Sequence, residues 1–250
     1  MPDKELSGKV AIVTGAGRNI GRAIALALAD AGASVVVNTR ANKEEADGVV
    51  REIESRGGKA LTQLGNVGDA KAVQAVADAA LDKFERIDIL INNAALRREK
   101  PIDGMSYEDW REVMNITLDG AFHCVKACLP ALRKNGGTII NIGGMSAHLG
   151  SKDRTHVMAA KMAIVGFTRG LAHDLAGDKI TVNCVVPGAI ETARAPGAAK
   201  PQHHLTRGTM TGERGKPDDV AAMVRHLCGP GGQYITGQSI HVNGGAYLAS

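Results

Sequence analysis

The chain has 250 residues, of which 44% are hydrophobic and only 3% aromatic, and its formal net charge is +4. This length and apolar content allow one full core, which aliphatic residues must fill because aromatic residues are scarce. The charge is too small and too scattered to favour a nucleic-acid-binding protein. There is no apolar run of about eighteen residues that would predict a membrane span. The polar start, Met-Pro-Asp-Lys-Glu, is not typical of a signal peptide, so we expect a cytoplasmic protein.

Strand-like and helix-like segments alternate along the whole chain. Runs rich in β-branched residues predict strands at 9–14, 34–39, 60–67, 87–92, 138–142, 180–185 and 239–242. Helical patterns fall between them at 20–31, 43–56, 70–84, 107–133, 157–175 and 218–227. This alternation is typical of an α/β fold with helices on both faces of a parallel sheet. We therefore predict a single domain over 1–250, a Rossmann-type doubly wound parallel sheet.

The sequence contains one long loop and four cysteines whose roles can be inferred from their spacing. Residues 189–216 form a long irregular stretch, and loops of this length are often functional, so we predict a substrate lid there. The four cysteines match no zinc-binding spacing: Cys124, Cys128, Cys184 and Cys228. We expect them to be buried thiols, and we predict no metal site.

A glycine-rich turn follows the first predicted strand, in the order Gly15-Ala-Gly-Arg18-Asn19-Ile20-Gly21. Between a strand and a helix, such glycines let the backbone approach a pyrophosphate, and the start of the helix offers N–H donors. We therefore predict that Gly15, Arg18, Asn19, Ile20 and Gly21 bind a dinucleotide. Asparagine is compatible with this turn because it tolerates left-handed backbone angles.

The end of the second strand bears on which dinucleotide is bound. Enzymes that use NAD usually carry an acidic residue there, which binds the ribose diol. This strand ends in Asn38-Thr39-Arg40 and has no acid. Arg40 and Arg18 are placed to bind an additional phosphate, because guanidinium groups pair well with phosphate oxygens. We predict NADP(H) as the cofactor; the alternative is that both arginines are simply solvated.

Further motifs follow in a matching order over nearly the whole chain. They are Thr14-Gly15-x-x-x-Asn19-x-Gly21, Asn66-Val67, Asn92-Asn93-Ala94-Ala95, Asn115, Pro187-Gly188-Ala-Ile190-Glu-Thr192, Tyr234-Ile-Thr-Gly and His241-Val-Asn-Gly-Gly. Together they resemble the short-chain dehydrogenases/reductases, and most of all the 3-oxoacyl carrier-protein reductases among them. The resemblance implies that the cofactor site also includes Asn66, Val67, Asn93, Ala94, Lys161, Pro187, Gly188, Ile190 and Thr192. It further implies an oxidoreductase that assembles as a homotetramer.

The same resemblance implies two catalytic hydroxyl groups that this sequence lacks. The family has serine where Gly144 stands, and tyrosine four residues before its lysine, where Val157 stands. The catalytic lysine and asparagine of the family remain, as Lys161 and Asn115. Three nearby residues are candidate replacements for the missing groups: Ser146, His148 and His156. For each of the three, the alternative is an ordinary loop residue.

Positive residues surround the expected pocket. They are Arg97, Arg98, Lys152 and Arg154 in two loops, and Arg194, Lys200, His203, His204 and Arg207 in the predicted lid. Either these are ordinary solvated cations, or they guide an anionic substrate such as a carboxylate or a phosphate-bearing thioester. We predict an NADP(H)-dependent oxidoreductase with a non-standard site, acting on a small carbonyl compound or an activated C=C bond. The alternative is a catalytically impaired NADP-binding relative that works in assembly or sensing.

Overall fold

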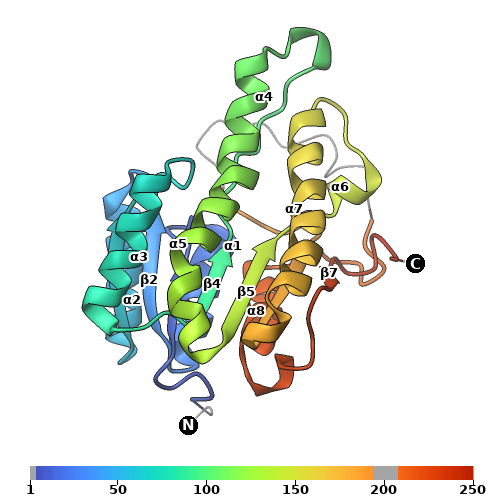
Figure 1. Ribbon diagram of the computed structural model, residues 1–250. Helices are drawn as coiled ribbons and strands as arrows, with labels where there is room; N and C mark the ends of the chain where they lie inside the picture. Colours follow the sequence, from blue (N-terminus) through green and yellow to red (C-terminus); the bar gives the residue numbers. More distant parts are fainter. Residues whose placement is uncertain (1–3, 194–207, 250) are drawn as a thin grey trace.

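The computed structural model describes residues 4–193 and 208–249. They form one seven-stranded sheet in the order β3-β2-β1-β4-β5-β6-β7, in which all neighbouring strands are parallel. The strands are β1 (Val10–Val13), β2 (Ser34–Thr39), β3 (Lys59–Leu64), β4 (Ile89–Asn92), β5 (Gly137–Ile142), β6 (Ile180–Pro187) and β7 (Ser239–Val242). Figure 1 shows helices on both faces of this sheet, which confirms the predicted fold.

Two layers of helices enclose the sheet. One face is covered by α1 (Asn19–Asp30), α2 (Lys43–Ser55) and α8 (Pro217–Cys228). The other face is covered by α3 (Ala70–Phe84), α5 (Gly120–Asn135) and α7 (Thr155–Asp174). Two further helices are α4 (Tyr107–Met114), which extends beyond the sheet ahead of α5, and the short α6 (Ser146–Leu149) after β5 (Figure 1). No helix in the described part of the chain is both long enough and apolar enough to cross a membrane.

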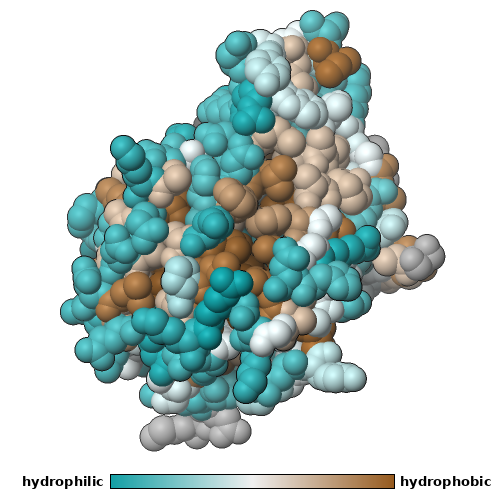
Figure 2. Space-filling model, viewed as in Figure 1, coloured by the Kyte–Doolittle hydropathy of each residue, from teal (hydrophilic) through white to brown (hydrophobic). Residues whose placement is uncertain are grey.

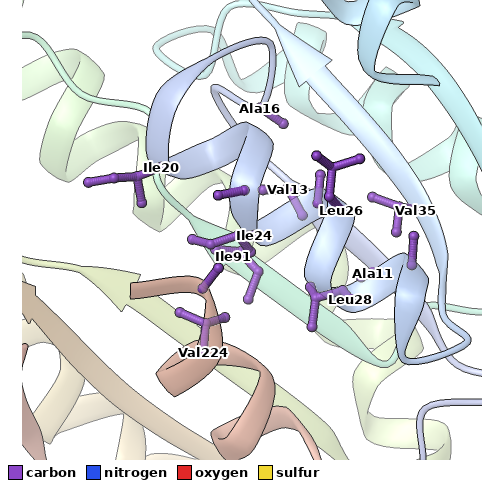
Figure 3. Packing of buried hydrophobic residues seen from close by; sticks show 14 of the residues in the cluster. Ala11, Val13, Ala16, Ile20, Ile24, Leu26, Leu28, Val35, Ile91 and Val224 are labelled. Carbon is purple, nitrogen blue, oxygen red and sulfur yellow. The ribbon is translucent and has the colours of Figure 1, made fainter. Parts of the chain in front are cut away.

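The core between the sheet and α1 is built from aliphatic side chains. Ala11 and Val13 of β1 point toward Ile24 and Leu28 of α1, and Val224 of α8 completes the cluster (Figure 3). All five side chains are fully buried. Because helices cover both faces of the sheet, β1 is a continuous apolar run and not an alternating one.

The predicted elements occur in the predicted order, but three segments differ. The strand expected at 60–67 ends at Leu64: the Gly65 N–H makes the last bond to β2, at Thr39 O (3.0 Å), and the chain then turns at Asn66. The short helix α6 was not predicted. The single helix expected at 107–133 is instead α4, a π turn at Asn115–Asp119, and α5.

The π turn passes close to the loop that follows β3. A Cβ on Gly68 would lie 2.5 Å from Asn115 Nδ2, and a Cβ on Gly120 would lie 2.7 Å from Val67 Cγ2. A larger residue at either position would displace the side chain of Asn115 or Val67. The extra residue of a π turn shifts the register of a helix, and such turns are frequent at functional sites. The side chain of Asn115, a predicted catalytic residue, lies beside this loop.

Candidate functional site

The strand order reverses between β1 and β4, and ligands of open α/β sheets usually bind at the carboxyl ends of such strands. Thr14 joins the two strands there. Its Oγ1 donates to Ile91 O (3.1 Å) and accepts from the backbone N–H groups of Asn93 (3.0 Å) and Ala94 (3.1 Å). Asn93 Nδ2 in turn donates to Thr14 O (2.8 Å) and Gly15 O (3.0 Å). The glycine-rich turn is thereby fixed to the loop that follows β4.

At its glycines, the turn leaves little room for a side chain. A Cβ on Gly21 would lie 2.3 Å from Gly15 O, and Gly15 adopts φ +62°. The side chain of Ile20 is buried in the core, so Ile20 can reach a ligand only through its backbone. No side chain caps the N-terminus of α1, so its first N–H groups are available to an anion. These features fit the pyrophosphate of a dinucleotide.

Charged side chains flank this turn on the side of β2. Arg18 and Arg40 are exposed, and in the described part of the chain neither side chain makes a hydrogen bond or salt bridge. A carboxylate that the sequence analysis did not consider also lies here, because a Cβ on Gly17 would be 3.3 Å from Glu45 Oε2. Glu45 belongs to the first turn of α2. The turn is thus bordered by two cations and one acid.

The loop after β3 lies on the same side of the crevice. Asn66 Oδ1 accepts a hydrogen bond from Gly68 N (3.1 Å), which closes a tight turn. Val67 is buried, and its carbonyl lies 3.1 Å from the ring Nδ1 of His123 on α5. Asn66 and Val67 are therefore held at the carboxyl end of β3.

Lys161 is the centre of the other half of the site. It lies on α7, and its Nζ donates a hydrogen bond to Ile142 O at the end of β5. The pKa of Lys161 is lowered from 10.5 to about 7, first by burial and then by the charges of Arg97 and Arg154, while Cys184 opposes the shift. Lys161 is thus a buried amine that changes its charge near neutral pH.

A chain of buried polar side chains holds α7 against the sheet. Asn92 Nδ2 donates to Asn141 Oδ1 (2.8 Å), Asn141 Nδ2 donates to Thr168 Oγ1 (2.9 Å), and Thr168 Oγ1 donates to Ile164 O (2.8 Å). Sequence reasoning did not assign roles to Asn141 and Thr168. The sequence feature that could have identified them is a polar residue within a buried apolar segment, because a buried polar group needs hydrogen-bond partners inside the protein.

Gly144 and Val157 stand where the sequence analysis expected hydroxyl groups. Gly144 lies close to Lys161 in space, and Val157 lies one turn before it on α7. A Cβ on Gly144 would meet a single atom within 4 Å, Lys161 Cγ at 3.9 Å, so a side chain there has room. Val157 is 2% exposed and packs with Val113 and Ala160. Neither residue has a group that could donate or accept a proton.

Two of the candidate replacements lie on α6. Ser146, the first residue of this helix, is half-buried. His148 packs against the C-terminal segment, with ring centroids 4.7 Å from His241 and 5.4 Å from Tyr247. Burial, and then the charge of Arg169, lowers the pKa of His148. The imidazole of His148 is thus part of an aromatic cluster with β7 and the residues that follow it.

His156, the third candidate, is almost completely buried at the start of α7. Burial lowers its pKa, and its charged neighbours include Asp109 of α4 and Arg98. His156 thus lies among charged groups of α4 and the neighbouring loops. It precedes by one residue the position that faces the same way as Lys161, so its side chain leaves the helix in a different direction.

The cations of the pocket differ in their surroundings. Arg98 forms a salt bridge with both carboxylate oxygens of Glu112, whereas the charges of Arg97 and Arg154 act on Lys161. Arg154 is only 7% exposed, an unusual degree of burial for an arginine. The Lys100 N–H donates to Asp153 O (2.6 Å), which ties the loop after β4 to the loop before α7.

The structure describes 189–193 and 208–216 of the predicted lid. The segment after β6 is anchored at Pro187, whose carbonyl accepts from Met145 N (3.0 Å), and at Gly188, whose N–H donates to Val242 O (2.9 Å). Ile190 is buried and Thr192 is half-buried. The predicted lid cations lie outside the described residues: Arg194, Lys200, His203, His204 and Arg207.

The four cysteines are free thiols, and one of them, Cys184, lies near enough to Lys161 to influence its charge. Cys124, Cys128 and Cys184 are buried, and Cys228 is partly buried. Burial raises the pKa of the Cys124 thiol to about 12 and that of Cys184 to about 11. Among the residues that the structure describes, no group of three His, Cys, Asp or Glu side chains could hold a metal ion.

Comparison with known proteins defines the class to which this fold and site belong. Residues 15–247 match the family described as enoyl-(acyl carrier protein) reductase. The chain belongs to the short-chain dehydrogenase/reductase family of NAD(P)-dependent oxidoreductases. Its curated relatives include the 3-oxoacyl-[acyl-carrier-protein] reductase of Synechocystis sp., which is 40% identical over 246 residues, covering 97% of this chain and 98% of that protein.

Solved structures of the same fold contain either form of the cofactor. A blue fluorescent protein from a metagenomic library, in complex with NADPH, is 34% identical and has a TM-score of 0.91, covering 98% of this chain and 100% of its own. A 7α-hydroxysteroid dehydrogenase, complexed with NADH and 7-oxo glycochenodeoxycholic acid, is 36% identical with a TM-score of 0.91, covering 97% and 96%. The fold therefore accepts both NADPH and NADH, and the choice between them depends on individual residues.

Proposed function

We propose that this protein is an NADP(H)-dependent oxidoreductase with a non-standard active site. It transfers hydride between the cofactor and a small anionic carbonyl compound or an activated C=C bond. The observation that carries the proposal is the environment of Lys161. Two cations, Arg97 and Arg154, act on this buried amine, while Gly144 and Val157 supply no hydroxyl group.

The glycine-rich turn, Asn93 and Thr192 would hold the cofactor, which when bound would supply or accept the hydride. Lys161 supplies positive charge where negative charge develops on the substrate oxygen. Reduction of a C=C bond conjugated to a carbonyl suits this site best, because the resulting enolate needs a cation but no hydroxyl donor. Water can then protonate the carbon. Ketone reduction at this site lacks a positioned acid, which makes it slower by about 10²–10⁴-fold.

Arg97 and Arg154 favour a substrate that carries its own negative charge. Both place positive charge near Lys161, and a substrate anion there would be held by charge-assisted interactions. A carboxylate or a phosphate-bearing thioester has this chemistry.

A panel of keto and enoyl substrates tests the proposal. Each acid is paired with its neutral amide, and NADPH oxidation is measured for both. We expect turnover of at least one enoyl or keto acid, and little turnover of its amide. Tight NADPH binding without hydride transfer to any member would instead support the alternative, a binding protein of this family that has lost catalysis.

Cofactor preference is the first quantitative prediction. NADP(H) should bind at least about tenfold more tightly than NAD(H), because charge-assisted hydrogen bonds from Arg18 and Arg40 reach the additional phosphate. Calorimetric titration with both cofactors measures this ratio. Arg40→Ala should reduce it, Glu45→Gln should raise it by removing the nearby carboxylate, and Arg51→Ala, at an exposed arginine of α2, should leave it unchanged. Equal or tighter binding of NAD(H) to the wild type contradicts the assignment.

Assembly gives a second prediction. Apolar surface extends over α5 and α7 (Figure 2), where Phe122 and Met162 are 49% and 40% exposed. Gly166 and Gly170 follow Met162 at four-residue spacing, and a Cβ on either would meet no atom, so two copies of α7 could approach closely. We expect a homotetramer with two-fold symmetry.

Light scattering at micromolar concentration checks the assembly. Gly166→Arg should dissociate the tetramer, because it places a charge on this surface. Ala75→Arg, on the exposed side of α3, is the matched control and should not. A wild type that is monomeric at this concentration rules out the prediction.

A further inference from the structure

Asn19 combines a special backbone conformation with an unexpected side-chain contact. It is the first residue of α1 and adopts φ +52°, in the left-handed region. Glycine would adopt this conformation without strain, so the turn does not require the carboxamide. What asparagine adds here, compared with glycine, is a side chain that can form hydrogen bonds.

The carboxamide binds the backbone of a residue 174 positions later in the chain. Asn19 Nδ2 donates to Ala193 O (3.2 Å), and Asn19 Oδ1 accepts from Ala193 N (2.8 Å). One side chain thus satisfies both backbone groups of Ala193, as a neighbouring strand would. The pair fixes the chain after β6 directly to the glycine-rich turn.

The segment that ends at Ala193 is also held at its other end. Glu191 N donates to Gly215 O (2.8 Å), and Gly215 N donates to Ala189 O (3.2 Å). We call residues 191–193 the strap. Thr192 lies in the middle of the strap, between the anchor at Gly215 and the anchor at Asn19. The hydrogen bonds on either side of Thr192 therefore fix its position relative to the uncapped start of α1.

We propose that Asn19 is a positioning residue that holds the strap against the glycine-rich turn and slows the release of the bound dinucleotide. This inference rests on the proposed function, because it requires a dinucleotide on that turn. A ligand that contacts both the start of α1 and Thr192 is enclosed by the Asn19–Ala193 pair. Its release requires the strap to move away, as with other loops that close over a ligand.

Asn19→Gly tests the strap, because it removes the carboxamide and keeps the backbone conformation. We expect NADPH to dissociate about fivefold faster or more, since two neutral hydrogen bonds near the surface are lost. Stopped-flow displacement of NADPH by excess NADP⁺, followed by fluorescence, measures the rate. The matched control is Glu85→Gly, which replaces another left-handed residue (φ +67°) at the end of α3. This variant should release NADPH at the wild-type rate.

A substitution at Ala193, the other partner of the contact, distinguishes a loss of this contact from a general loss of stability. Ala193→Pro removes the N–H that Asn19 Oδ1 accepts, so it should also speed release. The double variant Asn19→Gly/Ala193→Pro should release NADPH no faster than the faster single variant, because both changes break one contact. Ala193→Pro also carries the test if Asn19→Gly does not fold.

The outcomes separate this inference from the proposed function. Unchanged release from folded Asn19→Gly, or additive effects in the double variant, would overturn the role of Asn19 while leaving NADP(H) binding intact. A wild type that binds neither NADPH nor NADH would overturn the proposed function itself.

Discussion

Gly144→Ser combined with Val157→Tyr is expected to raise ketone reduction by about 10²–10⁴-fold, the usual contribution of a positioned general acid. Lys161 and Asn115 are already present. The serine has room, because a Cβ on Gly144 meets only Lys161 Cγ at 3.9 Å. Reduction of C=C substrates should stay the same or fall, since the new ring occupies part of the pocket. NADPH oxidation with matched keto and enoyl acids measures both activities.

The tyrosine is the more demanding change. Val157 packs against Val113 and Ala160, so a larger side chain must turn toward Lys161 or strain the core, at a cost of about 1–3 kcal/mol. Gly144→Ser with Val157→Phe is therefore the control, because it introduces the same ring without the hydroxyl. It should show the loss of stability but no gain in ketone reduction.

A different result would locate a proton donor elsewhere. If the wild type already reduces ketones rapidly, and a change of Ser146, His148 or His156 abolishes this activity, then the acid has moved and is not missing. His148 and His156 have ring nitrogens that are buried without a hydrogen-bond partner in the described structure. These nitrogens make both histidines suitable residues to change first.

Local patterns predicted the fold because each element carries its own signal. The bounds of β2, α3 and β7 are the predicted ones. α3, for example, begins after Asp69, whose side chain caps it, and ends at the left-handed Glu85. The π turn at Asn115–Asp119 has no comparable signal. It adds one residue to a helix whose apolar pattern continues on both sides, so the sequence does not mark it. In the structure this turn packs against Gly68.

The sequence predicted which residues surround the site, but it did not predict which of them contact each other. Charged residues near the pocket could be named from their loops, yet the sequence could not show that Arg98 pairs with Glu112 while Arg154 is buried. Glu45 lies next to Gly17 only because α2 begins beside the glycine-rich turn. Such pairings depend on distances across the fold, and sequence spacing does not contain them.

Removal of the Lys161 amine is the second change with a large expected effect. Lys161→Met should lower hydride transfer on the order of 10²–10³-fold, because developing negative charge on the substrate loses its cation. The pKa of Lys161 is lowered to about 7, so in the wild type kcat/KM should fall as pH rises through this value and the ammonium loses its proton. Lys161→Arg keeps a charge that does not titrate and should remove this fall in kcat/KM. A wild-type profile that is flat between about pH 6 and pH 9 excludes Lys161 as the titrating cation.

Stability provides an independent check on the same amine. Its pKa is about 7 in the folded chain and 10.5 in the absence of burial, so between these values the unfolded chain binds a proton that the folded chain has released. The unfolding free energy should therefore rise with pH across this window, on the order of 1 kcal/mol per pH unit. Below pH 7, the full cost of burying the charge remains. Urea unfolding of the wild type and Lys161→Met at several pH values measures the difference, which should grow in favour of the wild type as pH increases. A difference that is independent of pH would mean that the buried amine keeps its ordinary pKa.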